Sequence, residues 1–446
     1  MRKLCRRLKW DNHCSMPLGV YISVPFCRTK CSYCNFASDV FSKTVFDRYV
    51  DRVCADIGNA PQRAWEMGGA CEREVNSIYL GGGTPTVLEP AQLQRIFASV
   101  RQQFSALPDA EVTVECAPGT LTPEMIDTLL RCGVNRVSLG VQSFVDGEAA
   151  AVGRLHKRAT VFEEIARLRA SGITNINIDL IAGLPHQTAE SWRFSLAETI
   201  ATGAPHVSVY MLEIDEDSRL GSELIAGGNR YHAHFVPDED ATADFYIQAC
   251  EELNSAGITQ YEISNFARAG FESRHNLKYW TRQPYFGFGV DAHSMLSMNR
   301  ERHEFTLEPA LSERSESKGA AKTQARQRGF SPCGDVDAVR FAAPDSLDRY
   351  LSCELPQANA ISADAALEET FFLGLRLTQG ISLEETAARF GFDAVNRHRP
   401  AIAEMVESGL LEKVEHRIRL TPRGRLLSNE VFQRFLSPAP HEVSSQ

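Results

Sequence analysis

Three cysteines stand close together near the start of the chain, with three residues between Cys27 and Cys31 and two between Cys31 and Cys34. Soft thiolates this close in sequence can hold a single metal ion or an iron–sulfur cluster. Structural zinc sites usually have four protein ligands, and no fourth Cys or His follows at the spacing of a zinc ribbon. An iron–sulfur cubane also usually takes four cysteines. With three, one iron stays open to a chelating ligand, and this is the chemistry that the spacing favours.

Other residues with chemical potential come at the ends of expected strands. Gly81, Gly82 and Gly83 precede Thr84, and glycines let the backbone approach a ligand closely, although a tight turn would also use them. Carboxylates and amides in such places can bond ribose hydroxyls, and an arginine can pair with a carboxylate. Each could equally be a structural polar residue. The candidates of this second kind are Glu115, Gln142, Arg154 and Asp179.

The elements that must position these residues alternate between strands and helices. Apolar, β-branched runs predict strands over residues 19–24, 76–80, 111–114, 136–141, 175–180 and 206–212. Helical spacing of apolar residues predicts helices over 91–104, 123–131, 160–170 and 190–200. Six strand–helix units in series predict a parallel α/β sheet. Because polar or glycine residues follow almost every strand, a partial (β/α)6 barrel with one mouth is favoured over an open sheet of the dinucleotide-binding type.

The chain continues beyond this barrel. We expect a helix over 240–256 and a strand over 260–263. Residues 308–337 contain almost no large apolar residue and are typical of a flexible insertion or linker. Helices over 366–377, 382–390 and 395–408, with a hairpin across 416–417, predict a small winged-helix-like, mainly helical domain. We therefore expect an N-terminal tail (1–17), the barrel with an extension (18–307), the linker (308–337) and a C-terminal domain (338–446).

Composition narrows the class of protein. The 446 residues include 43% hydrophobic residues, which excludes a disordered or coiled-coil chain. No run approaches the ~18–20 apolar residues of a membrane span. The formal net charge of −10 makes nucleic-acid binding a poor expectation. The first seventeen residues are basic but lack the apolar stretch of a secretory signal, and Met16 is an alternative start. We expect a cytoplasmic protein.

The cysteine spacing, with the aromatic Tyr33 before the third cysteine and a βα barrel around it, resembles the radical SAM superfamily. The resemblance implies a [4Fe-4S] cluster held by Cys27, Cys31 and Cys34. Its open iron would bind the amino and carboxylate groups of S-adenosylmethionine (SAM). Reduction of the cluster would then cleave SAM to a 5′-deoxyadenosyl radical.

Within the superfamily the chain resembles the coproporphyrinogen-oxidase-like branch over about residues 18–436. Other branches of the superfamily have an acidic residue directly after the glycines. In this chain the position is Thr84, and the coproporphyrinogen-oxidase-like branch shows the same replacement. The resemblance implies nothing for the first seventeen residues or for 308–337. It implies that residues from all around the barrel mouth bind SAM: Tyr21, Tyr33, Gly82, Gly83, Thr84, Glu115, Gln142, Arg154 and Asp179.

Two kinds of protein in this branch must be separated. Oxygen-independent coproporphyrinogen III oxidases have a longer N-terminal segment and a further cysteine two residues after the third, where this chain has Phe36. A family of heme chaperones shares Cys-x-Phe at this place and has a His-Asn-x-x-Tyr-Trp motif. The resemblance to this second family implies heme as a ligand and acceptor hemoproteins, respiratory ones among them, as partners. The residues that match its motif are His275, Asn276, Tyr279 and Trp280.

These residue types suit a porphyrin. His275 offers an imidazole to heme iron, with His293 or a cysteine as a substitute, and the aromatic rings offer flat apolar faces. Asn276 or Lys278 could meet a propionate. A surface turn whose aromatic residues cap the barrel is the alternative explanation.

A third hypothesis is an RNA-modifying radical SAM enzyme that grips tRNA with its C-terminal domain. The net charge of −10 favours a merely solvated surface there. Whether SAM is turned over is left open by the sequence, as is the oligomeric state. The basic residues that such a domain would use are Arg417, Arg419, Arg423 and Arg425.

Overall fold

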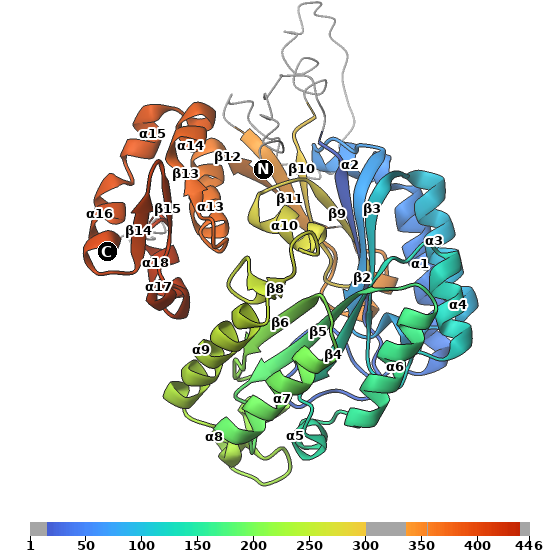
Figure 1. Ribbon diagram of the computed structural model, residues 1–446. Coiled ribbons are helices and arrows are strands. Elements are labelled where there is room, and N and C mark those ends of the chain that lie inside the picture. The colour runs from blue at the N-terminus through green and yellow to red at the C-terminus, as the bar shows by residue number, and fades with distance from the viewer. Residues whose placement is uncertain (1–15, 300–335, 355, 438–446) are drawn as a thin grey trace, which may run out of the picture.

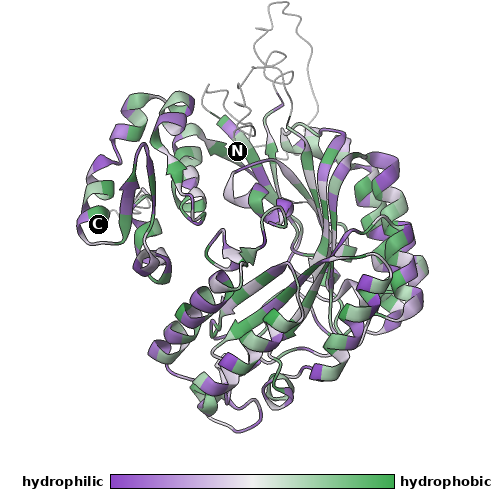
Figure 2. Ribbon diagram, viewed as in Figure 1, coloured by the Kyte–Doolittle hydropathy of each residue, from purple (hydrophilic) through white to green (hydrophobic). Residues whose placement is uncertain are grey.

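The computed structural model describes residues 16–299, 336–354 and 356–437; the expected tail up to residue 15 and the expected linker from 308 to 335 lie outside them. Among the described residues, twelve strands form one sheet in the order β12-β11-β10-β9-β1-β2-β3-β4-β5-β6-β8-β7. Figure 1 shows this sheet curving, with helices along its outer side. Hydrophobic residues concentrate on the strands and on the helix sides that face them (Figure 2). No helix in the described part of the chain is long and apolar enough to cross a membrane.

Six neighbouring parallel strands confirm the partial barrel predicted from the sequence. Parallel strands covered by helices are apolar on both faces, and in the first strand only Tyr21 is partly exposed. The third strand begins earlier than expected, because residues 105–106 pair with 74–75 of the second. The strands are β1 (Leu18–Val24), β2 (Glu74–Gly82), β3 (Ser105–Cys116), β4 (Arg136–Gln142), β5 (Asn175–Ala182) and β6 (His206–Met211).

Helices connect these strands, and the four predicted ones are confirmed. In α4, Thr122 Oγ1 accepts a hydrogen bond from Met125 N (3.2 Å), and Pro123 occupies the first turn. Gly133, with a φ of 79°, follows the end of the helix in the left-handed conformation that glycine adopts most easily. The connecting helices are α1 (Phe46–Gly58), α2 (Ala60–Met67), α3 (Pro90–Gln103), α4 (Pro123–Arg131), α5 (Asp146–Ala151), α6 (Arg158–Ala170) and α7 (Ala189–Ala201).

Further strands extend both edges of the barrel and keep the sheet open. At one edge β8 (Asn265–Ala267) pairs antiparallel with β6, and β7 (Thr259–Gln260) pairs with β8. The strand expected over 260–263 is therefore wrong in extent, because the chain turns after residue 260 to return along β6. At the other edge β9 (Tyr285–Phe288) runs parallel to β1. Antiparallel strands follow it: β10 (His293–Ser297), β11 (Val336–Ala342) and β12 (Ala358–Ser362).

Strand β12 and most of β11, which the sequence assigns to the C-terminal domain, thus belong by their pairing to the central sheet. The division into domains stays a prediction. The helix expected over 240–256 is confirmed as α9. The helices of these extensions are α8 (Arg219–Ala226), α9 (Glu239–Ser255), α10 (Arg274–Trp280) and α12 (Leu347–Leu351), with 3-10 turns η1 (Lys43–Val45), η2 (Pro85–Val87) and η3 (Ala233–Phe235).

The mainly helical C-terminal part is confirmed, with a three-stranded antiparallel sheet of order β13-β15-β14. One prediction is wrong: residues 395–408 do not form a single helix. They are divided between α15 (Phe392–Asn396) and α16 (Arg399–Glu407), because Pro400 in the first turn of α16 cannot extend a preceding helix. The other elements are α13 (Ala363–Gly374), β13 (Ile381–Ser382), α14 (Leu383–Phe390), β14 (Leu411–Val414), β15 (Arg417–Leu420), α17 (Pro422–Leu426) and α18 (Ser428–Gln433).

A group of ion pairs joins this part to the central sheet just after α10. The Arg282 side chain is only 2% exposed, and it lies 2.8 Å from Glu369 Oε2 on α13 and 3.1 Å from Asp337 Oδ2 on β11. Arg340 on β11 binds the other oxygen of Glu369 at 2.8 Å. A buried guanidinium is tolerated only when carboxylates pair with it. The packing of α10 therefore depends on residues far away in the sequence.

We expect Glu369→Ala to lower the free energy of unfolding by about 3–5 kcal/mol, because the buried Arg282 loses one of its two carboxylates. Urea unfolding followed by circular dichroism measures this loss. The exposed pair of Arg397 with Asp364, also on α13, supplies the control. Asp364→Ala should cost less than about 1 kcal/mol. Equal losses in the two variants would contradict the importance given to Arg282.

Candidate cluster and cofactor site

The three cysteines lie on the loop that follows β1, at the mouth of the partial barrel. Cys31 is buried, Cys27 and Cys34 are partly exposed, and all three are free thiols. Backbone hydrogen bonds shape the loop: Cys27 N donates to Asp39 O (3.0 Å) and Cys34 N donates to Cys31 O (3.3 Å). Burial raises the pKa of the Cys27 thiol. The loop thus presents three sulfur donors from one short segment.

The glycine segment (residues 81–84), at the end of β2, lies directly against the backbone of this loop. Gly83 N donates to Val24 O and Thr84 N donates to Phe26 O, each at 2.8 Å. A Cβ atom on Gly83 would lie 2.7 Å from Val24 O and 2.8 Å from Phe26 O. Gly82 has a φ of 95°, which side-chain-bearing residues rarely adopt. A larger residue at position 83 would therefore push the two segments apart.

Besides Ser38 of the loop itself, whose Oγ lies 3.9 Å from Cys34 Sγ, two side chains from other segments face the sulfur atoms. Arg154 Nη1 lies 3.6 Å from Cys31 Sγ, and its Nη2 donates to Gly140 O. Thr84 Oγ1 lies 3.9 Å from Cys27 Sγ. The Arg154 guanidinium thus places a fixed positive charge beside the sulfur of Cys31. It is also placed to pair with an anionic group bound close to the sulfurs.

Glu115, at the end of β3, supports the glycine segment from the opposite side. Its Oε1 accepts a hydrogen bond from Tyr79 Oη (2.7 Å) and its Oε2 accepts one from Gly82 N (3.2 Å). A Cβ atom on Gly81 would lie 2.7 Å from the Glu115 carboxyl carbon. Burial raises the pKa of Glu115 to about 7, although the two hydrogen bonds oppose the shift. The carboxyl group therefore changes its charge near neutral pH.

Asp179 and Gln142 lie on neighbouring strands, Asp179 within β5 and Gln142 at the end of β4. Asp179 accepts hydrogen bonds from Ser138 (3.1 Å) and Asn177 (2.7 Å), and burial raises its pKa. Gln142 has a φ of 70°, next to an irregularity in the pairing of β4 with β5. Its buried side-chain oxygen has no hydrogen-bond partner among the described residues. A left-handed backbone together with an unsatisfied buried acceptor is typical of a ligand site.

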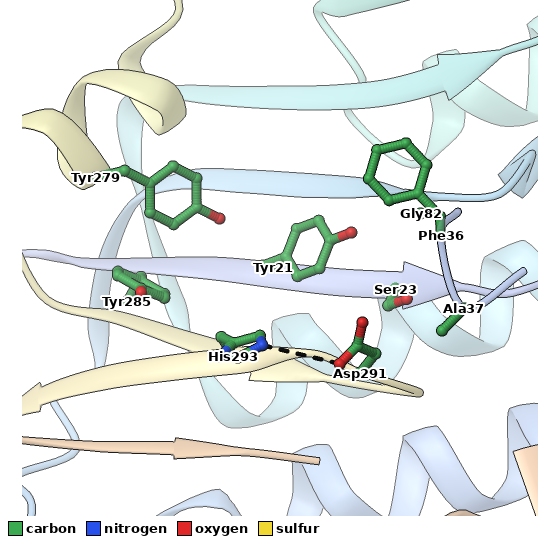
Figure 3. Close-up of a pocket in the computed structure, with 9 residues that line it drawn as sticks. All are labelled: Tyr21, Ser23, Phe36, Ala37, Gly82, Tyr279, Tyr285, Asp291 and His293. Atoms are coloured by element: carbon green, nitrogen blue, oxygen red, sulfur yellow. Dashed lines mark ion pairs between the residues drawn. The ribbon is translucent and has the colours of Figure 1, made fainter. Parts of the chain in front are cut away.

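A cavity of about 310 Å³ opens beside the glycine segment, lined by Tyr21, Ser23, Phe36, Ala37, Gly82, Tyr279, Tyr285, Asp291 and His293 (Figure 3). Two predicted SAM residues, Tyr21 and Gly82, and one predicted heme residue, Tyr279, thus share one space. Tyr33 is placed elsewhere, against an apolar cluster of Val152, Ile181 and Leu184. The volume lies at the lower end of the ~300–1,000 Å³ usual for small-molecule sites.

The histidine of the predicted heme motif does not line this cavity. His275 is 1% exposed on α10. Its Nδ1 shares a 2.9 Å hydrogen bond with Ser77 Oγ, and its Nε2 shares one of 2.9 Å with Tyr279 Oη. Burial lowers the pKa of His275 to about 3, so the ring is neutral at physiological pH. In this structure His275 positions Tyr279, and binding iron would require it to give up a hydrogen bond.

The other motif residues also have protein partners. Lys278 Nζ donates to Pro17 O (2.7 Å), and its side chain is buried, so the structure does not place it where a propionate would reach. The guanidinium of Arg376 lies 4.2 Å from the ring centre of Trp280. Asn276 belongs to the first turn of α10. The heme roles of Asn276 and Trp280 stay a prediction.

The residues at the mouth fit an iron–sulfur cluster with SAM. One loop supplies three sulfur donors, Arg154 lies beside one of them, and Gln142 offers an unpaired acceptor. Such a cluster, when bound, supplies the electron that cleaves SAM. Within the described ranges, no three His, Cys, Asp or Glu side chains come close enough to hold a single metal ion. A cubane differs from a single metal ion, because each of its cysteines binds a different iron. The absence of a single-ion site among the described residues therefore does not test the cluster, and ligation by this triad stays a prediction.

Comparison with known proteins defines the class to which this fold and site belong. The sequence pattern of the Radical SAM superfamily matches residues 21–197, and that of the HemN C-terminal domain matches 361–427. The solved structure of coproporphyrinogen III oxidase (HemN) from Escherichia coli has a TM-score of 0.73 at 22% identity, covering 94% of this chain and 90% of its own. That likeness shows the fold. The radical SAM class implies a [4Fe-4S] cluster and SAM.

Sequence relatives then define the family. The heme chaperone HemW of Bacillus subtilis (strain 168) is 32% identical over 419 residues, which cover 94% of this chain and 99% of the relative. The heme chaperone HemW of Escherichia coli (strain K12) is 31% identical over 425 residues, which cover 94% and 98%. This chain belongs to the family of the heme chaperone HemW.

Sequence reasoning missed four residues of the cavity. None of them was a candidate, and they are Ser23, Ala37, Tyr285 and Asp291. A signal was present, because Gly287 and Gly289 form a second glycine-rich stretch at the end of β9, beside β1. A Cβ on Gly289 would clash with the backbone of β1, which shows how tightly this segment packs there.

We expect anaerobic reconstitution to give about four iron and four sulfide ions per chain. Replacing Cys27, Cys31 and Cys34 together by Ala should abolish this content, because no other thiol replaces them on the loop. Replacing the buried Cys116, away from the loop, is the matched control and should leave the content unchanged. Full iron content in the triple variant would contradict the cluster assignment.

The raised pKa of Glu115 predicts a pH dependence of stability. The folded state holds the proton up to about pH 7, whereas the unfolded chain releases it near its ordinary value of 4.5. The folded state therefore gains stability from this proton at low pH and loses it as pH rises from about 5 to 7, by on the order of 1–3 kcal/mol. Urea unfolding midpoints across this range should fall more for the wild type than for Glu115→Gln. Parallel curves for the two proteins would show that Glu115 titrates normally.

Proposed function

We propose that this protein is a heme chaperone, which binds heme and hands it to acceptor hemoproteins while carrying a [4Fe-4S] cluster and SAM. The observation that carries the proposal is the relationship to HemW proteins at more than 30% identity over 94% of the chain. The cavity beside the glycine segment supports it. Three tyrosines line that cavity and offer the flat, amphipathic faces that suit a porphyrin.

In this proposal Cys27, Cys31 and Cys34 hold the cluster, and the fourth iron stays open to SAM. Arg154, beside the Cys31 sulfur, is placed to pair with the SAM carboxylate. The unpaired side-chain oxygen of Gln142 offers a hydrogen bond to one of its other polar groups. The remaining proposed SAM residues are Tyr21, Tyr33, Gly82, Gly83, Thr84, Glu115 and Asp179.

The two alternatives have weaker support. Coproporphyrinogen oxidation is favoured by the likeness to HemN, but at 22% identity this likeness concerns the fold alone. Phe36, at the position of the oxidases' further cysteine, is 67% exposed at the cavity rim. RNA binding by the C-terminal domain has weak support because arginines that would contact RNA already form hydrogen bonds or ion pairs within the protein. Arg417 donates to Gln379 O and Gly380 O, and Arg419 pairs with Glu412.

Two finer points belong to the same proposal. Respiratory hemoproteins are among the acceptors that we propose, since they are major users of heme. We also propose a cytoplasmic location, in line with the thiols of the site, which need a reducing compartment.

The proposal is tested by two assays on one preparation of reconstituted protein. We expect hemin titration to give a saturable Soret band at about one heme per chain. Anaerobic incubation with coproporphyrinogen, SAM and a reductant should give no protoporphyrinogen. The triple cysteine variant is the control for cluster-dependent turnover. Robust protoporphyrinogen formation by the wild type would overturn the proposal in favour of the oxidase.

A further inference from the structure

The cavity has two chemically different ends, which Figure 3 separates clearly. Gly82, Phe36 and Ala37 lie at the end near the cysteine loop, where SAM is proposed to bind. Tyr279, Tyr285 and His293 lie at the other end, and Tyr21 stands between the two groups. A planar apolar ligand with a metal centre is the chemical class that three tyrosine rings and an imidazole fit.

His293 is the histidine that faces this space. Of the histidines in the described ranges, it is the one that lines the cavity. Its side chain is 58% exposed, so metal binding requires no unpacking. His275, by contrast, is 1% exposed, with hydrogen bonds at both ring nitrogens. His206 is also buried and bonded at both nitrogens, to Asn177 and Tyr261.

Asp291 lies beside the His293 ring, at a distance somewhat longer than that of a hydrogen bond. Its Oδ1 lies 3.8 Å from His293 Nε2, and the dashed line in Figure 3 marks this pair. Histidines that bind metals usually direct one ring nitrogen at a carboxylate, which fixes the ring and raises its basicity. Asp291 has a φ of 57°, and its N donates to Pro344 O (2.8 Å), so its backbone is held in an uncommon conformation. Such strain clusters at functional sites.

We propose that His293 is the protein ligand of the heme iron, with Asp291 orienting its imidazole and Tyr279 and Tyr285 lying along the porphyrin. This inference rests on the proposed function. It assigns His275 the role of a positioning residue, which holds Tyr279 through its Nε2. A porphyrin is larger than the cavity, so part of the macrocycle stays exposed on the side of the solvent-accessible His293. Partial exposure suits a protein that must release its heme to another.

The test is hemin titration of the full-length, reconstituted protein and its variants. We expect His293→Ala to shift the Soret band and to weaken hemin binding by about tenfold or more, and added imidazole to restore the band. Asp291→Asn should weaken binding by about tenfold while keeping the band position, as outer partners of metal ligands do. His416→Ala, an exposed histidine between β14 and β15, is the matched control and should bind like the wild type. His275→Ala should keep the band position.

The outcomes separate this inference from the proposed function. Iron and sulfide contents equal to those of the wild type establish that each variant is folded. An unshifted Soret band and unchanged affinity in His293→Ala would overturn the assignment, and a band lost in His275→Ala instead would transfer it to His275. Both results leave the chaperone function intact. Absence of hemin binding by the wild type would overturn the function itself, and the assignment with it.

Discussion

The site depends on one close backbone contact, between the glycine segment at the end of β2 and the chain that leaves β1. Gly83 and Thr84 donate hydrogen bonds to Val24 O and Phe26 O, where no Cβ would fit at position 83. Because β1 lies between β2 and β9 in the middle of the sheet, this contact fixes the cysteine loop at the barrel mouth. Glu115 packs against the glycine segment from the other side and accepts a hydrogen bond from Gly82 N. The cysteine loop, the glycines and the end of β3 are therefore held together by direct contacts.

The same strand also connects the cluster site to the predicted heme motif. Tyr21 on β1 lines the cavity together with Tyr279 from α10, and α10 packs on β2 through the bond between His275 and Ser77. Arg282, just after α10, then joins the C-terminal part through Glu369. A change in the C-terminal part can therefore reach the cavity through α10.

Much of this could be predicted from the sequence because the signals are local. The cap of α4 at Thr122 and the apolar run of β1 identify their elements, and the spacing of the cysteines identifies the class. The break at Pro400 was also visible in the sequence. The role of His275 was not, because it depends on Ser77, which is 198 residues away. His293 and Asp291 reach the cavity only through the pairing of β9 with β1, a long-range contact that periodicity does not encode.

The central claim is that this protein binds heme and transfers it to an acceptor protein. The most direct measurement mixes the heme-loaded protein with a heme-free b-type cytochrome and follows the Soret spectrum over time. The account predicts that the spectrum changes to that of the loaded cytochrome. It also predicts that the cytochrome is loaded faster than in a reference mixture, which contains the same concentration of hemin and an unrelated heme-binding protein in place of this one. Heme that stays on this protein, or a cytochrome that fills no faster than from such a mixture, would contradict the account.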